Sequence, residues 1–125
     1  MRVHIGRQAA LATVLVSLAL PAGAGSQLTM RVSPGVAYAP ASFTIHVFVE
    51  PHAENRAIHV FADSALFFRS SVVELDGQRA PRTTIIRYRA MPAGAYEVST
   101  VLLGEGGEQR AIVRQGVTVI GGGGQ

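Results

Sequence analysis

The chain has 125 residues, with 11 arginines, no lysine and eight acidic residues, and its formal net charge is +3. Arg2 and Arg7 lie in an N-terminal leader, so the rest of the chain is nearly neutral and lacks the basic excess that nucleic-acid binding requires. No cysteine is present, which excludes disulfides, thiol catalysis and an anchor attached to a lipidated cysteine.

Residues 1–24 have the three parts of a secretory signal peptide. Arg2 and Arg7 form the positive start, residues 9–20 form an apolar run, and Ala22-Gly23-Ala24 provides the small residues that a signal peptidase accepts. The apolar run is too short to span a bilayer comfortably as a helix. We therefore expect a periplasmic or secreted protein that begins at or near Gly25 and has no membrane span in its mature chain.

The first half of the remaining chain predicts four short strands, because apolar side chains alternate with polar ones between turn-forming residues. The second and third strands each carry a His-Val-Phe triplet on an alternating pattern, at residues 46–48 and 59–61. Asp76-Gly77 predicts a tight turn after the fourth strand. The four strands are expected over residues 28–32, 41–50, 57–63 and 67–75.

The second half predicts three more strands and two turns. Residues 91–94 (Met-Pro-Ala-Gly) form the first turn, and the glycine-rich residues 104–107 form a hairpin loop. Residues 109–120 form either a final strand pair or one bulged strand, with Gly116 as the expected bulge. Residues 121–125 cannot pack and predict a flexible glycine-rich tail. The strands are expected over residues 81–90, 96–103 and 109–120.

About seven short strands with turns roughly every ten residues predict an all-β protein, an antiparallel β-sandwich over residues 25–120. Ile86 is assigned to the core and Ile85 to the solvent side, because Arg87 and Arg89 share the face of Ile85. The expected core consists of Phe43, Ile45, Val47, Val60, Ile86, Tyr96, Val98 and Leu102.

The stretch Pro92-Ala93-Gly94-Ala95-Tyr96-Glu97-Val98 resembles a corner found in bacterial immunoglobulin-like and fibronectin-III-like domains. The resemblance implies that Tyr96 sends its hydroxyl back to the backbone of the preceding corner, near residues 88–91. It covers residues 27–120 and implies an immunoglobulin-like β-sandwich, but it does not imply a function, because domains of this shape have many different functions. The cysteine pair and the core tryptophan of antibody domains are absent.

Three histidines, His46, His52 and His59, are the candidate metal ligands of the mature chain, and carboxylates lie among them. Imidazole and carboxylate groups bind copper or zinc. The spacing matches no known ligand set, and a sandwich commonly places the strands of His46 and His59 in opposite sheets. We favour the interpretation that these three residues are surface histidines that bind no metal. The alternative is that the chain is a periplasmic metal-binding protein that uses them as ligands.

Phe48 and Phe61 are predicted to point away from the core, which makes them the candidate binding residues for a protein partner. The alternative is that a neighbouring segment, Leu66-Phe67-Phe68, folds over one of them. The sequence comes closest to a basic cluster at Arg82, Arg87 and Arg89. We interpret these arginines as solvent-facing residues of one strand and its turn.

The sequence contains no pattern typical of a catalytic site. Ser70-Ser71 lies in an extended segment without a nucleophile elbow, and the glycines at 104–107 lead into a strand instead of a helix. We therefore predict an exported, non-catalytic binding or structural module without a bound cofactor, whose partner is another exported protein or a cell-surface component. A further alternative is an accessory subunit that pairs an edge strand with a larger exported enzyme or fibre.

Overall fold

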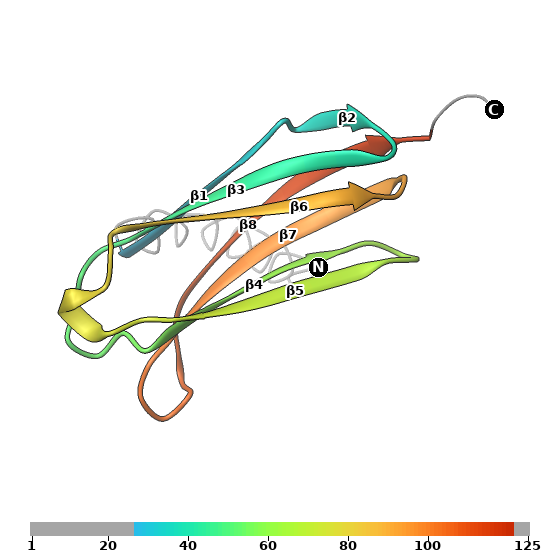
Figure 1. Cartoon of the computed structure of the whole chain (residues 1–125). Coiled ribbons are helices and arrows are strands. Elements are labelled where there is room, and N and C mark those ends of the chain that lie inside the picture. Colours follow the sequence, from blue (N-terminus) through green and yellow to red (C-terminus); the bar gives the residue numbers. More distant parts are fainter. Residues whose placement is uncertain (1–26, 122–125) are drawn as a thin grey trace, which may run out of the picture.

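The computed structural model describes residues 27–121, and these residues form eight strands and one short 3-10 turn, Gly77–Arg79 (Figure 1). The predicted signal peptide, its cleavage position and residues 122–125 of the tail lie outside the described residues. Within the described range, no helix has the length and apolarity needed to cross a membrane. The strands are β1 Leu28–Ser33, β2 Val36–Tyr38, β3 Ala41–Val49, β4 Ala57–Asp63, β5 Phe68–Glu74, β6 Thr83–Met91, β7 Gly94–Leu103 and β8 Gln109–Ile120.

Two sheets pack face to face. The three-stranded sheet has the order β1-β3-β6, and the five-stranded sheet has the order β2-β8-β7-β4-β5 (Figure 1). The all-β prediction is confirmed, and seven of the strands lie where the alternation placed them. The purely antiparallel prediction is wrong at one place, because β2 pairs in parallel with β8. The three residues of β2 are too few to show a period of two, so the sequence pattern missed this strand.

The core lies between the two sheets and follows the predicted alternation. Seven of the eight expected core residues are buried, and Ile86 is partly buried against them. Ile85 points to solvent with 58% of its surface exposed, which confirms the predicted register of β6. Phe43 packs edge-on against both tyrosines of the core, Tyr88 and Tyr96.

The corner before β7 forms as the resemblance implied. Tyr96 is buried, and its hydroxyl donates a hydrogen bond of 2.7 Å to the carbonyl of Pro92. The acceptor is one residue beyond the expected stretch, 88–91. Burial raises the pKa of the Tyr96 hydroxyl above its usual value.

A bulge interrupts the pairing of β7 with β8, but it is not at Gly116, which pairs regularly with Glu97. The register shifts between Leu102, which faces Ala111, and Leu103, which faces Gln109. Arg110 is therefore the extra residue. A bulge turns a side chain away from its regular direction, and the Arg110 side chain reaches the loop between β3 and β4.

Candidate functional site

The structure does not bring the three candidate metal ligands together. His46 lies in β3 on the outside of the three-stranded sheet, His59 lies in β4 on the outside of the five-stranded sheet, and His52 lies in the loop between these strands. Because β3 and β4 belong to opposite sheets, the core separates His46 from His59. Among residues 27–121, no group of three or more His, Asp or Glu side chains is arranged to hold a metal ion.

The two candidate aromatic residues also lie on opposite faces, so they do not form one joint surface. Phe48 in β3 is 37% exposed on the three-stranded sheet. Phe61 in β4 is half-buried on the other sheet, where its ring centroid lies 5.1 Å from that of His59 and 6.0 Å from that of Phe68. Phe68, which lies on the neighbouring strand β5, covers part of Phe61.

The contacts of Phe61 belong to a larger apolar surface, which we call the β5 rim. It consists of His59 and Phe61 on β4, and Phe68 and Val72 on β5. The register places Val72 beside His59, and Ser70 beside Phe61. Phe68 is 57% exposed and Val72 is 63% exposed. The sequence pattern missed both residues, because only the order of strands shows that β5 lies at the edge of its sheet.

The backbone of β5 offers hydrogen-bonding groups on the side facing away from β4. Ser64 donates to the carbonyl of Phe67 at 2.9 Å, and Leu75 donates to the carbonyl of Arg56 at 2.8 Å. These two bonds lie at the ends of the strand. In an antiparallel ladder, alternate residues direct their backbone groups to the same neighbour. The odd-numbered residues of β5 therefore face β4, and Phe68, Ser70, Val72 and Glu74 face outward.

Contacts to β6 fix the position of β5. The Tyr88 hydroxyl donates to the carbonyl of Val60 at 3.2 Å and lies 3.0 Å from the Ser71 hydroxyl. Burial raises the pKa of Tyr88, and the bond to Ser71 offsets part of this rise. The guanidinium of Arg69 donates to the carbonyl of Arg89 at 2.8 Å and stacks 5.6 Å from the ring of Tyr88. The free edge is thus held in place, which reduces the entropic cost of binding a partner.

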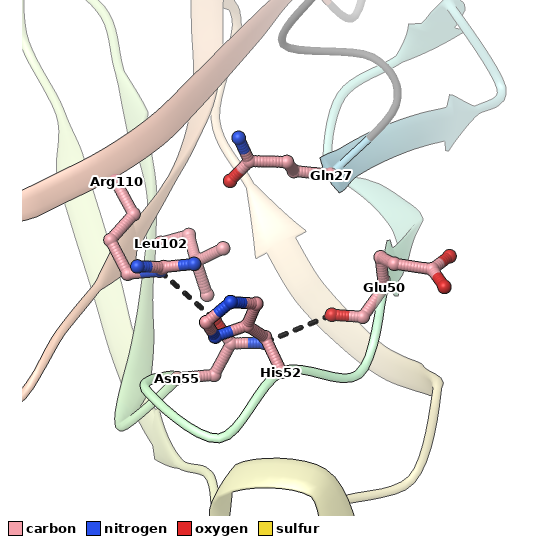
Figure 2. A pocket seen from close by; sticks show the side chains of 6 residues that line it. All are labelled: Gln27, Glu50, His52, Asn55, Leu102 and Arg110. Carbon is pink, nitrogen blue, oxygen red and sulfur yellow. Dashed lines mark hydrogen bonds between the residues drawn. The ribbon is translucent and has the colours of Figure 1, made fainter.

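A pocket of about 200 Å³ lies at one end of the sandwich (Figure 2). The buried side-chain amide of Asn55 lines this pocket, donates to the carbonyl of Glu50 at 3.0 Å and accepts from Arg110 at 3.2 Å. Arg110 also contacts Glu54 at 3.0 Å. These polar groups form hydrogen bonds and an ion pair with one another. The arrangement therefore holds the β3–β4 loop in place. Its lining residues are Gln27, Glu50, His52, Asn55, Leu102 and Arg110.

No protein-family model matches the chain, and a comparison with curated proteins finds no match. Two variants of superoxide reductase (neelaredoxin) from Ignicoccus hospitalis are similar in structure, each with a TM-score of 0.59 and 14% sequence identity, over 74% of this chain and 79% of that chain. The sulfur carrier protein SoxY from Chlorobium limicola f. thiosulfatophilum has a TM-score of 0.53 and 16% identity, over 83% of this chain and 94% of that chain. At these identities, the likeness shows a shared fold alone.

Proposed function

We propose that the chain is an exported, non-catalytic, immunoglobulin-like module that binds another exported protein by accepting a strand of that partner at the free edge of β5. The observation that carries this proposal is the β5 rim. The backbone groups of Ser70 and Val72 face outward from the sheet edge, and the side chains of Phe68 and Val72 are exposed beside them on the outer face of the sheet. In strand addition, the main chain provides affinity and the flanking side chains provide specificity.

The other edges of the two sheets are less suited to this role. The side chain of Gln115 occupies the backbone groups of Val32 in β1. β2 has three residues, and β6 carries Arg87 and Arg89, charges of the kind that discourage pairing at an edge. Between Arg69 and Glu74, β5 has no charged residue and no proline. The chemistry of the edges therefore favours β5 as the binding strand.

The activity named for the similar superoxide reductase is not part of this proposal, because the likeness concerns the fold. A metal-binding function through His46, His52 and His59 has no support from their placement. The immunoglobulin-like assignment is supported by the two-sheet fold and by the corner at Tyr96. Export rests on the sequence of residues 1–24.

The proposal is tested with a photo-crosslinking amino acid placed at residue 72 and, as a control, at residue 36. Val36 is a valine of similar exposure on the edge strand β2. We expect an adduct with one discrete exported protein from position 72 and none from position 36. Absence of an adduct at 72, equal adducts at both positions, or an adduct with a second copy of this chain would contradict the proposal.

Binding between the two purified proteins then tests the role of the backbone. Val72→Pro removes an outward-facing N–H while it leaves the bonds to β4 in place. Val72→Lys adds a charge to the edge. We expect each change to weaken the affinity at least about tenfold, which corresponds to the loss of about 1.4 kcal/mol. Val36→Lys is the matched control and should leave the affinity unchanged. An affinity insensitive to both changes at Val72 would overturn strand addition.

A further inference from the structure

The outside of the three-stranded sheet has only one sign of charge. Its strands contain Arg31, Arg87 and Arg89, which supply the charge, together with His46 and no aspartate or glutamate. The two ion pairs found among residues 27–121 involve other arginines, Arg56 and Arg110. The positive charges of this face are therefore not neutralised by acidic side chains of the described fold.

The strand register brings these residues together from three parts of the sequence. Arg31 lies beside His46, and His46 lies beside Ile85 on the other side. In the next row of the same face, Arg87 lies beside Thr44. The sequence pattern showed only the arginines of residues 82–89, because the position of Arg31 depends on the pairing of β1 with β3.

A shallow groove of about 470 Å³ crosses this face, and we call it the β3 groove. The Nδ1 atom of His46 is buried and has no hydrogen-bond partner among the described residues. The groove is lined by Thr29, Met30, Arg31, His46, Val47, Phe48 and Thr83.

We propose that the outside of the three-stranded sheet binds a carboxylate-rich segment of a second protein, with one carboxylate held between Arg31 and His46 in the β3 groove and another held by Arg87 in the row beyond the groove. Carboxylate oxygens accept charge-assisted hydrogen bonds from guanidinium groups and from an imidazole N–H. The exposed side chains of Phe48 and Ile85 flank the charges and add apolar contact. Arginine combined with aromatic and aliphatic side chains is typical of protein interfaces.

The geometry of the sheet limits the spacing of the acidic residues in the partner. Arg31 and Arg87 are two strands and one row apart, which corresponds to about 12 Å from the strand and residue spacings of a sheet. An extended chain covers that distance in three or four residues. The expected partner segment therefore carries Glu or Asp residues separated by two or three other residues.

The test is an NMR titration of the isotope-labelled chain with poly-L-glutamate at low ionic strength. We expect the amide signals of β1, β3 and β6 to shift, and Arg31→Glu to weaken the binding about tenfold, as the loss of a charge-assisted hydrogen bond implies. Arg114→Glu makes the same charge change on the exposed outside of β8 and is the matched control. It should change the affinity by less than about twofold.

Three results would overturn this inference. The first is equal weakening by the two charge reversals, which indicates an effect of net charge alone. The second is binding that His46→Phe leaves unchanged. The third is tighter binding of dextran sulfate or phosphatidylglycerol vesicles through the same residues, which identifies a polysaccharide or a membrane as the occupant. None of these results bears on cross-linking at residue 72, so the two proposals fail independently.

Discussion

The side-chain amide of Gln115 occupies both backbone hydrogen-bonding groups of Val32. The Val32 N–H donates to Oε1 at 3.1 Å, and Nε2 donates to the Val32 carbonyl at 3.0 Å. Val32 belongs to the three-stranded sheet and Gln115 to the five-stranded sheet. The Gln115 side chain thus makes the two backbone hydrogen bonds that a neighbouring strand would otherwise make with Val32. Because the two residues belong to different sheets, these bonds also connect the sheets beside β1.

Replacement of Gln115 by leucine removes both hydrogen bonds and leaves the backbone groups of Val32 without partners. We expect the free energy of unfolding to fall by about 1–3 kcal/mol, measured by urea denaturation. Gln109→Leu, at the exposed start of the same strand, is the control and should change the stability by less than about 0.5 kcal/mol. Equal effects of the two changes would show that the bonds to Val32 contribute nothing.

Tyr96→Phe removes only the hydroxyl that bonds to Pro92. The carbonyl of Pro92 then lacks this partner, and we expect a loss of about 1–3 kcal/mol in the free energy of unfolding. Tyr38→Phe makes the same chemical change at an exposed tyrosine and should have little effect. If Tyr96→Phe proved neutral, the corner would not stabilise this fold.

Alternation predicted the fold because each strand buries one face. His46 and Phe48 share a face of β3, and the structure confirms that this face is outside the core. Local sequence does not determine which strands become neighbours. The parallel pairing of β2, the bulge at Arg110 and the edge position of β5 all depend on contacts between distant residues.

The same limit applies to the candidate sites. His46 and His59 were candidate ligands because they lie on successive strands with His52 in the loop between them, and the structure places these strands in different sheets, as is common in a sandwich. Arg31 and Arg87, in contrast, are far apart in sequence and lie on the same face of one sheet, with β3 between their strands. The placement of Arg31 and Arg87 on one face has no local signal that pattern analysis could detect, because it depends on the pairing of β1 and β6 with β3.

Val47→Ala tests the register of the central strand β3. Val47 is fully buried, so the loss of two methyl groups should lower the free energy of unfolding by about 1–3 kcal/mol. Ile85→Ala removes more side chain on the paired strand β6, but Ile85 faces solvent and the expected change is below about 0.5 kcal/mol. The reverse order of effects would mean that the register is shifted by one residue.

The exported protein should begin at or near Gly25. Ala22 and Ala24 provide the small residues that signal peptidase accepts, and this expectation comes from sequence alone. Intact-mass spectrometry of the protein recovered from the periplasm or the medium measures the cleavage site. The double change Ala22→Arg and Ala24→Arg should prevent cleavage by signal peptidase, because both small residues are then lost. Recovery of an uncleaved chain beginning at Met1 from the unaltered protein would contradict the prediction.

Alkaline pH should destabilise the fold through its two core tyrosines. Burial raises the pKa values of Tyr88 and Tyr96 above the ordinary value of 10.0, so each holds its proton more tightly in the folded state than in the unfolded state. Their contribution to stability is complete below pH 10.0 and is lost as the pH rises through the folded-state values, because the unfolded chain ionises first. Urea denaturation at a series of pH values should show this decline above about pH 10. The double change Tyr88→Phe and Tyr96→Phe should make the decline shallower, whereas an unaltered slope would show that other groups cause the alkaline unfolding.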